Sequence, residues 1–172
     1  MERTFFRLIA HTFVFDADGR LLVLRRANTG FLDGYYTLPG GHVDRGEEVA
    51  RAAIREVLEE VCIDVAEIEP VIAMPYRHGV DFLFEARRWT GEARIGEPEF
   101  CDALTWAAPD RLPEPTAPCV TTARYLRAAG VWYPVWRLGR PLWSPVLAPR
   151  RTQRRAATRA APTLLESGAF DC

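Results

Sequence analysis

The chain contains no lysine, because all 22 of its basic residues are arginine. Without a lysine amine, the protein lacks a residue that could form a Schiff base or act as a lysine general base. Long apolar runs are missing as well, and none approaches the ~18 residues of a membrane-spanning helix. The N-terminus also lacks a signal-peptide pattern. We therefore expect a cytoplasmic protein that does not associate with membranes.

Cysteine and net charge are also sparse. The four cysteines stand far apart in the sequence, and no C-x-x-C pair indicates a zinc or redox motif. The formal net charge is −1, which makes a nucleic-acid-binding protein unlikely by composition. The charge is uneven, however, since most residues that carry charge between 137 and 172 are arginines. We interpret that segment as a solvated tail in preference to a nucleic-acid-binding arm.

The length of 172 residues, 48% of them hydrophobic, suffices for one complete core but hardly for two. Beyond Gly139 the content of Pro, Arg and Ala rises and the apolar periodicity fades. We predict one domain over residues 1–138 and a disordered tail over 139–172. Four aromatic residues around this boundary either complete the core or form a homodimer contact: Trp132, Tyr133, Trp136 and Trp143.

Residues 41–63, GHVDRGEEVARAAIREVLEEVCI, have the most informative spacing in the chain. A helix over 47–62 would place Glu56, Glu59 and Glu60 on one side, since residues three or four apart are neighbours on a helix surface. Like charges so placed repel one another, so this acidic side requires a compensating cation. Mg²⁺ is the natural candidate, because it joins carboxylates to substrate phosphates. Apolar residues form a separate stripe for the core: Ala50, Ile54, Val57, Leu58 and Val61.

Three glutamates alone would fit a solvated acidic face, screened by Arg51 and Arg55, equally well. The surrounding pattern favours a functional site. The order G-x5-E-x7-R-E-U-x-E-E-x-G-U, where U is apolar, is the Nudix box, and this stretch resembles it at Gly41, Glu47, Arg55, Glu56, Val57, Glu59, Glu60 and Ile63. Leu38-Pro39-Gly40 also looks like the entry to that box. Cys62 replaces the second glycine, so we expect a cysteine where a left-handed helix end usually favours glycine.

The resemblance covers roughly residues 5–130 and implies the Nudix fold, an α/β/α sandwich with a mixed β-sheet. It also implies that Glu56 and Glu60 are the primary ligands of Mg²⁺ or Mn²⁺, together with the carbonyl of Gly40. Glu59 would be a further ligand or the general base. Residues that support the site without taking part in the chemistry would be Gly41 and the Glu47–Arg55 pair.

A loop before the predicted strand 101–106 also resembles Nudix proteins, where such a loop often supplies an additional glutamate. Glu97 and Glu99 are the candidates, and we favour Glu99 as the general base. Arg26, at a strand end, is by the same resemblance a candidate phosphate contact. Asn28, in the Gly-rich loop 27–34, is a candidate for substrate selection, although turn chemistry explains it about as well.

Three other polar residues receive structural interpretations. His11 lies between apolar neighbours, so we interpret it as a hydrogen-bonded packing residue. Arg77 and His78 are interpreted as surface turn residues. The remaining pattern predicts strands over 5–15, 21–26, 35–38, 68–74, 81–89 and 101–106, with the first two forming a hairpin around 16–19. A closing helix is predicted over 116–129, with Thr116 as N-cap and Gly130 as the stop.

Together these observations predict a metal-dependent pyrophosphohydrolase. Water would attack a phosphoanhydride in a nucleotide-type small molecule, a nucleoside diphosphate linked to another moiety. Two alternatives share the scaffold. A non-catalytic nucleotide-binding Nudix module would normally lose box carboxylates, and an isopentenyl-diphosphate isomerase requires a cysteine motif that the sequence does not place.

Overall fold

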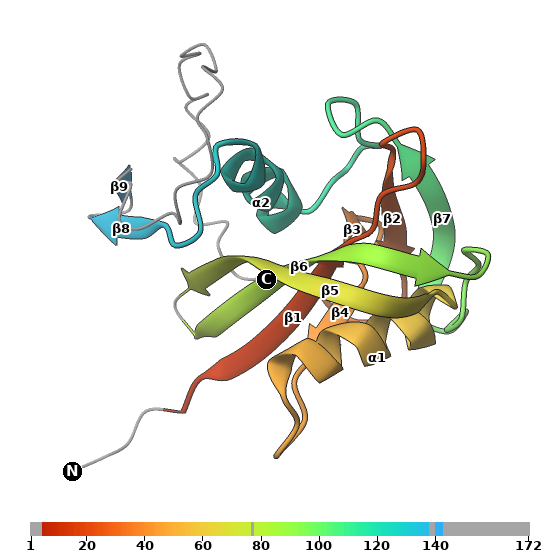
Figure 1. Cartoon of the computed structure of the whole chain (residues 1–172), viewed down its shortest axis with the longest axis horizontal. Coiled ribbons are helices and arrows are strands. Elements are labelled where there is room, and N and C mark those ends of the chain that lie inside the picture. The colour runs from red at the N-terminus through yellow and green to blue at the C-terminus, as the bar shows by residue number, and fades with distance from the viewer. Residues whose placement is uncertain (1–4, 77, 138–139, 143–172) are drawn as a thin grey trace.

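The structure is a computed structural model and describes residues 5–76, 78–137 and 140–142. Figure 1 shows α1 and α2 on opposite sides of the main strands. The elements, in chain order, are β1 (Arg7–Phe13), β2 (Leu21–Arg26), β3 (Tyr36–Thr37), β4 (Gly40–His42), α1 (Val49–Val61), β5 (Asp64–Tyr76), β6 (Gly79–Thr90), β7 (Cys101–Ala107), α2 (Pro118–Ala128), β8 (Val135–Arg137) and β9 (Arg140–Leu142).

The main sheet is mixed, as predicted. Its strand order is β4-β1-β6-β5, in which β1 and β6 are parallel and the other neighbours antiparallel. A second sheet, β3-β2-β7, is antiparallel, and β8 pairs with β9. The two sheets with a helix on each side (Figure 1) confirm the predicted α/β/α architecture.

The predicted hairpin of the first two strands is correct only at its turn. Asp16 N donates to Arg20 O at 3.0 Å, and Phe15 bridges to Leu21. Beyond that bridge the strands separate, because β1 pairs with β4 and β6 on its two edges while β2 pairs with β3 and β7. Both strands thereby satisfy their backbone groups on both sides with partners distant in the sequence.

Helix α1 packs on the main sheet through small residues. Ala52 and Ala53 are fully buried and cluster with Ala10 of β1 and Phe84 of β6, so the helix backbone lies close to the sheet. The predicted stripe is buried at Val57 and Val61 and partly buried at Ala50 and Ile54. The prediction was wrong for Leu58, whose side chain is 52% exposed. The buried side of α1 includes Ala52 and Ala53 in place of Leu58.

The two helix ends test the predicted caps. Cys62 has φ 58 and ψ 28, so the cysteine does take the left-handed conformation expected at the glycine position of the box. At the start of α2, Thr116 is not the N-cap. Ala117 holds that position, and the Thr116 hydroxyl donates to Pro113 O instead. Gly130, with φ 67, follows the end of α2 as predicted.

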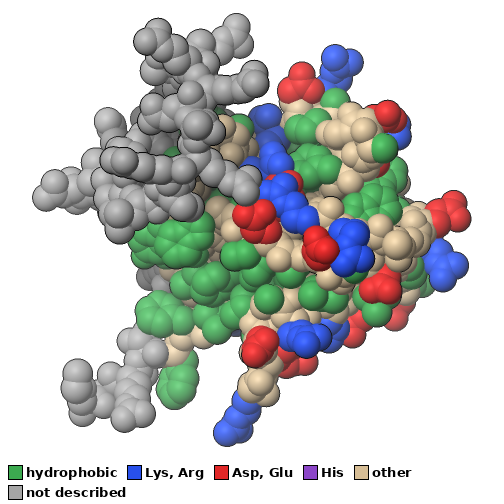
Figure 2. Space-filling view, in the orientation of Figure 1, with side chains coloured by type: hydrophobic (Ala, Val, Ile, Leu, Met, Phe, Trp, Pro, Cys, Tyr) green, Lys and Arg blue, Asp and Glu red, His purple; other side chains and the backbone are tan. Residues whose placement is uncertain are grey.

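The C-terminal prediction is only partly covered by the structure. Within the predicted tail, β9 is a strand, whereas residues 143–172, including Trp143, lie outside the described residues, as does Arg77. Trp132 and Tyr133 are 52% and 46% exposed, and hydrophobic side chains also gather over β5 and β6 on the face shown in Figure 2. The homodimer stays a prediction. No helix in the described part of the chain has the length and apolar character that a membrane crossing requires.

Candidate active site

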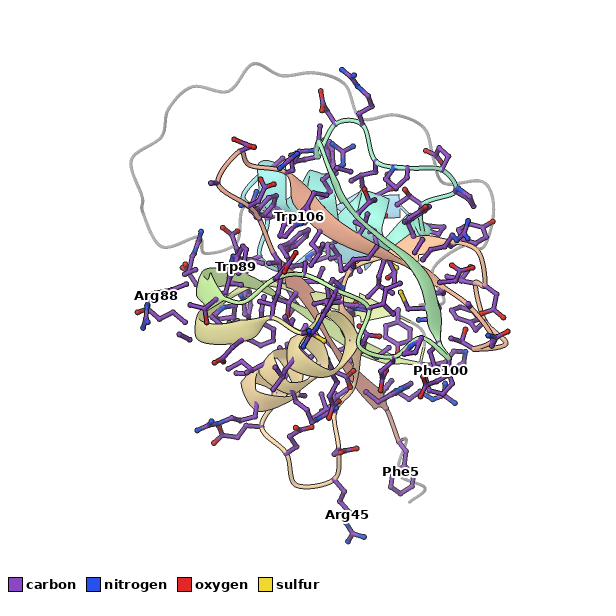
Figure 3. All side chains as sticks on the ribbon, turned by 90° about the vertical axis from the view of Figure 1, so that its right-hand side faces the viewer. Phe5, Arg45, Arg88, Trp89, Phe100 and Trp106 are labelled. Atoms are coloured by element: carbon purple, nitrogen blue, oxygen red, sulfur yellow. The ribbon has the colours of Figure 1, made fainter. Side chains whose placement is uncertain are left out.

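A cleft of about 910 Å³ contains most of the residues that the sequence singled out. Its size lies within the range of small-molecule sites, ~300–1,000 Å³. One wall comes from β4 and α1, and another comes from the loops that precede β3 and β7, with Phe100 labelled on the second loop in Figure 3. The predicted site residues that line this cleft are Arg26, Gly40, Gly41, Arg55, Glu56, Glu60 and Glu97.

Two glycines of the entry to α1 make room for the acidic side chains. A Cβ added to Gly41 would lie 2.6 Å from Oε1 of Glu56, so a larger residue there would displace that carboxylate. Gly40 has φ +153, and a Cβ there would lie 2.2 Å from Ala10 O. Close pairing of β4 with β1 therefore requires glycine, and it brings the turn against α1.

Glu60 is the most perturbed carboxyl group of the cleft. Its Oε2 accepts a hydrogen bond from Gly40 N at 2.8 Å. Burial raises the pKa of Glu60 to about 7, and the nearby charges of Glu56 and Glu97 add to that rise. Burial also raises the pKa of Glu56, against the opposing effect of Arg55. The charged form of both side chains is therefore disfavoured in this cleft.

Arg55 connects the turn to the acidic side of α1. Its Nε and Nη2 donate to the two carboxylate oxygens of Glu47 at 2.9 and 3.0 Å, and Nη2 also donates to His42 O. Its Nη1 donates to Glu56 at 2.8 Å and to Glu59 at 2.9 Å. Arg55 lowers the pKa of Glu47 through these hydrogen bonds. The predicted Glu47–Arg55 pair is therefore present and bidentate, a strong geometry.

The loop before β7 reaches the site because it caps the C-terminus of α1. Arg94 N donates to Val61 O at 3.1 Å and Gly96 N donates to Glu60 O at 2.9 Å, which satisfies carbonyls that a helix end leaves unpaired. Glu97 follows directly and lines the cleft near Glu56 and Glu60. Glu99 is exposed and is not one of the lining residues.

Asn28 and Arg26 occupy different places relative to the cleft. Asn28 adopts φ 56, and its side-chain amide donates to Glu99 O at 3.0 Å, so it joins the two loops rather than lining the cleft. Arg26 lines the cleft, and its Nε donates to Phe31 O at 2.9 Å. Among the described residues no carboxylate forms an ion pair with Arg26, so its other nitrogens stay available for an anion.

The family of the chain follows from comparison with known proteins. The family model described as NUDIX domain matches residues 6–126, which include the whole cleft wall from β4 and α1. The chain belongs to the Nudix hydrolase family. A solved structure of a MutT NUDIX hydrolase from Burkholderia pseudomallei is 31% identical, covers 69% of this chain and 95% of that chain, and has a TM-score of 0.64.

Relatives include several enzymes whose names state different substrates. The NAD-capped RNA hydrolase NudC of Stutzerimonas stutzeri is 34% identical over 143 residues, 82% of this chain and 49% of the relative. The ADP-ribose pyrophosphatase of Methanocaldococcus jannaschii is 32% identical over 99 residues, 52% of this chain and 58% of the relative. The chain spans about a third to a half of the length of the NudC relatives that it matches.

The donors of the Nudix box fit a hard divalent cation. They are carboxylate oxygens, the ligands that Mg²⁺ and Mn²⁺ prefer. In the conformation described, no three His, Cys, Asp or Glu side chains of the described residues converge into a metal site. Glu59 is exposed, and its carboxylate, like that of Glu56, accepts a hydrogen bond from Arg55. Burial raises the pKa of both Glu56 and Glu60, and a cation beside them would stabilise the charged carboxylates that burial disfavours.

The sequence did not identify one polar pair in this Nudix cleft. His11 lines the cleft and is 8% exposed, and its Nδ1 lies 2.9 Å from Oδ1 of Asp81, which is 1% exposed. The predicted hydrogen-bonded packing role of His11 is confirmed. The residue also lines the cleft, which the sequence did not predict. An aspartate within an apolar strand signals a buried partner, since an unpaired buried charge is costly. That signal does not say which residue the partner is.

Proposed function

We propose that this Nudix hydrolase is a metal-dependent pyrophosphohydrolase that cleaves a nucleoside diphosphate linked to another moiety. The observation that carries the proposal is one cleft lined by Glu56, Glu60 and Glu97 and by Arg26, which has no carboxylate partner among the described residues. Carboxylates can hold a divalent cation, and a free guanidinium can hold a phosphate. A phosphoanhydride requires both.

In this proposal Glu56 and Glu60 would hold Mg²⁺ or Mn²⁺, with Glu59 or the Gly40 carbonyl as further ligands. When bound, the cation would neutralise phosphate charge and lower the pKa of the attacking water. Arg26 would orient the diphosphate, because its guanidinium is already fixed by the hydrogen bond to Phe31 O. Arg55 would keep Glu47, Glu56 and Glu59 in position on α1.

The general base is better assigned to Glu97 than to Glu99. A base must come within hydrogen-bond reach of the water, directly or through another water. Glu97 lines the cleft, whereas Glu99 is exposed outside it and its backbone carbonyl is bound to Asn28. Glu59 remains the competing base within the box, and its carboxylate accepts a hydrogen bond from Arg55.

A substrate panel tests the proposal. Purified protein is incubated with ADP-ribose, an NAD-capped RNA, 8-oxo-dGTP and a dinucleoside polyphosphate, each with Mg²⁺, with Mn²⁺ or with excess chelator. We expect release of a nucleoside monophosphate from at least one compound only when the metal is present. The first three compounds are the substrates that the names of three relatives state. Turnover that persists in chelator would contradict metal dependence.

The same panel, with isopentenyl diphosphate added as a further compound, separates the alternatives. A non-catalytic Nudix module would bind a nucleotide without producing any product. An isopentenyl-diphosphate isomerase would convert isopentenyl diphosphate to its isomer with no release of phosphate. The retention of all box carboxylates, with Glu56 and Glu60 lining one cleft, supports hydrolysis over both.

A further inference from the structure

We propose that Asn28 is a positioning residue for the reaction, which holds Glu97 in the cleft through the backbone of the turn 97–100. This inference rests on the proposed function and concerns a residue outside the Nudix box that does not line the cleft itself. Three observations carry it: the contacts that fix the turn on both sides, the hydrogen bonds that Glu97 O accepts within the turn, and the residue type that position 28 requires.

The turn 97–100 is fixed to α1 on one side. Gly96 N donates to Glu60 O, and a Cβ added to Gly96 would lie 1.9 Å from Glu59 O, so the loop backbone lies directly against the end of the helix. A larger residue would push the loop away from α1. This contact determines where the chain enters the turn, one residue before Glu97.

The loop 27–34 fixes the other side of the turn. Ala27 N donates to Phe100 O at 2.8 Å, and the side-chain amide of Asn28 donates to Glu99 O at 3.0 Å. The hydrogen bond from Asn28 is the one of the two that a side chain makes, so a substitution can remove it and leave the backbone contact in place. The turn is therefore held between the helix wall of the cleft and the opposite loop.

Glu97 belongs to the same hydrogen-bonded turn. Its carbonyl oxygen accepts from Phe100 N and from Cys101 N, both at 3.0 Å, so its backbone follows the position of the far end of the turn. The Glu97 side chain lines the cleft, whereas Asn28 holds that far end outside the cleft. A shift of the far end displaces the proposed base from the attacking water, and a misplacement of about 1 Å can cost ~10²-fold in rate.

Position 28 combines two requirements that asparagine meets. Its φ of 56 lies in the left-handed region, which favours glycine, asparagine and aspartate. The contact with Glu99 O also requires a donor, which glycine and an ionised aspartate both lack. Turn geometry alone would accept any of the three residue types, whereas the contact with Glu99 O selects asparagine.

Steady-state kinetics test this role on the panel compound that the wild type hydrolyses best. Asn28→Gly keeps the backbone conformation and removes the donor. We expect kcat to fall about fivefold or more with KM changed less than about twofold, the scale of one lost hydrogen bond. Asn28→Asp, which keeps the shape of the side chain and loses the donor, should behave in the same way. It replaces Asn28→Gly should that variant fail to fold.

Asp102→Asn is the matched control. Asp102 pairs with Arg25 at 2.7 and 2.9 Å, and the pair joins β2 to β7 where these strands meet the two loops, outside the cleft. The control should leave kcat within about twofold of the wild type. An equal loss of kcat in Asp102→Asn and Asn28→Gly would indicate general loosening of β2 and β7 and would overturn the inference. A rise in KM with unchanged kcat in Asn28→Gly would overturn it as well.

A double-mutant cycle tests whether Asn28 acts through Glu97. Asn28→Gly should lower kcat in the wild type but change it less than about twofold in a Glu97→Gln background, since the displaced group is then already gone. An equal loss in both backgrounds would contradict the inference. A normal rate in Glu97→Gln alone would also contradict it.

Hydrogen exchange provides a measurement without turnover. Phe100 N and Cys101 N donate to Glu97 O, so their exchange rates report whether the turn is intact. Both amides should exchange faster in Asn28→Gly than in the wild type, while Gly96 N, which donates to α1, should be unchanged. Unchanged exchange of all three amides, or equal acceleration of all three, would refute the proposed role of Asn28.

Failure of this inference and failure of the proposed function are distinguishable. If the wild type hydrolyses the panel while Asn28→Gly keeps the wild-type kcat, only the role of Asn28 falls. If nothing in the panel is hydrolysed while exchange at Phe100 and Cys101 depends on Asn28, the contact that holds the turn stands and the proposed reaction falls.

Discussion

Two walls of the cleft are built in different ways. The helix wall, formed by β4 and α1, comes from one contiguous segment, and its acidic side chains are fixed by Arg55 and by Gly40 N. The loop wall, formed by residues 27–34 and 97–100, comes from two distant segments joined by Asn28 to Glu99 O and by Ala27 N to Phe100 O. The helix wall presents carboxylates in fixed positions, whereas the loop wall presents exposed aromatic rings.

The comparison indicates a division of labour. A preorganised wall suits the chemical step, because its groups need little rearrangement when charge develops. A wall made of loops suits substrate selection, because loops vary without disturbing the scaffold. Glu97 is the exception, since it belongs to the loop wall but lies near Glu56 and Glu60. The predictions below test this division.

Glu60→Gln should have the largest effect. It removes a proposed metal ligand from the helix wall, and we expect kcat/KM to fall by about 10³-fold, since a metal ion supplies several kcal/mol of charge stabilisation. The fold should persist, because the amide keeps the shape of the side chain. Steady-state kinetics measure kcat/KM, and thermal unfolding measures whether the fold persists. Glu48→Gln is the control, an exposed glutamate at the N-cap of α1 that makes no capping hydrogen bond. A normal rate in Glu60→Gln would contradict the metal assignment.

Glu97→Gln should have the next largest effect on the rate. It also tests whether a residue of the loop wall takes part in the chemical step. As a lost general base it should lower kcat by roughly 10²–10⁴-fold with little change in metal affinity. Glu99→Gln, the neighbouring control outside the cleft, should stay near the wild-type rate. If both variants have normal rates while Glu59→Gln is impaired, the base belongs to the helix wall. All groups of the chemical step would then lie on that wall.

Aromatic truncations of the loop wall should have a smaller and different effect. Phe31 and Phe100 line the cleft and are 44% and 48% exposed, so each can stack on a base. Stacking contributes ~1–3 kcal/mol per base, so Phe31→Ala or Phe100→Ala should raise KM about 10-fold with kcat nearly unchanged. Phe6→Ala, an exposed phenylalanine outside the cleft, is the control. A fall in kcat without a change in KM would place these rings in the chemical step.

The smallest expected effect concerns the pH dependence of stability. The pKa of Glu60 is raised to about 7 from 4.5, so its contribution to the stability of the metal-free protein is complete below the unfolded value and is lost as the pH rises through about 7. The melting temperature in chelator should therefore fall with pH over this window, and less steeply in Glu60→Gln. Added Mg²⁺ should stabilise the wild type more at high than at low pH, since the ligands must be deprotonated. If the melting temperature falls equally steeply with pH in the wild type and in Glu60→Gln, the raised pKa of Glu60 is contradicted.

The sequence by itself determined the helix wall. Local spacing sufficed, because the period of the helix fixes which side chains share a face. The glutamates on the side of α1 away from its apolar stripe, the Glu47–Arg55 pair and the left-handed Cys62 all follow from residues within one segment. A stretch whose partners are at most some twenty residues away needs no knowledge of the topology.

Tertiary structure decided the rest, because the remaining contacts join segments that only strand pairing brings together. Glu97 rather than Glu99 lines the cleft since the loop first caps α1 through Arg94 and Gly96, which no periodicity in the loop reveals. Asp81 meets His11 only because β1 pairs in parallel with β6, a register set by backbone hydrogen bonds across the sheet. Two polar residues in apolar strands each indicate a buried partner, but the sheet alone makes them partners of one another.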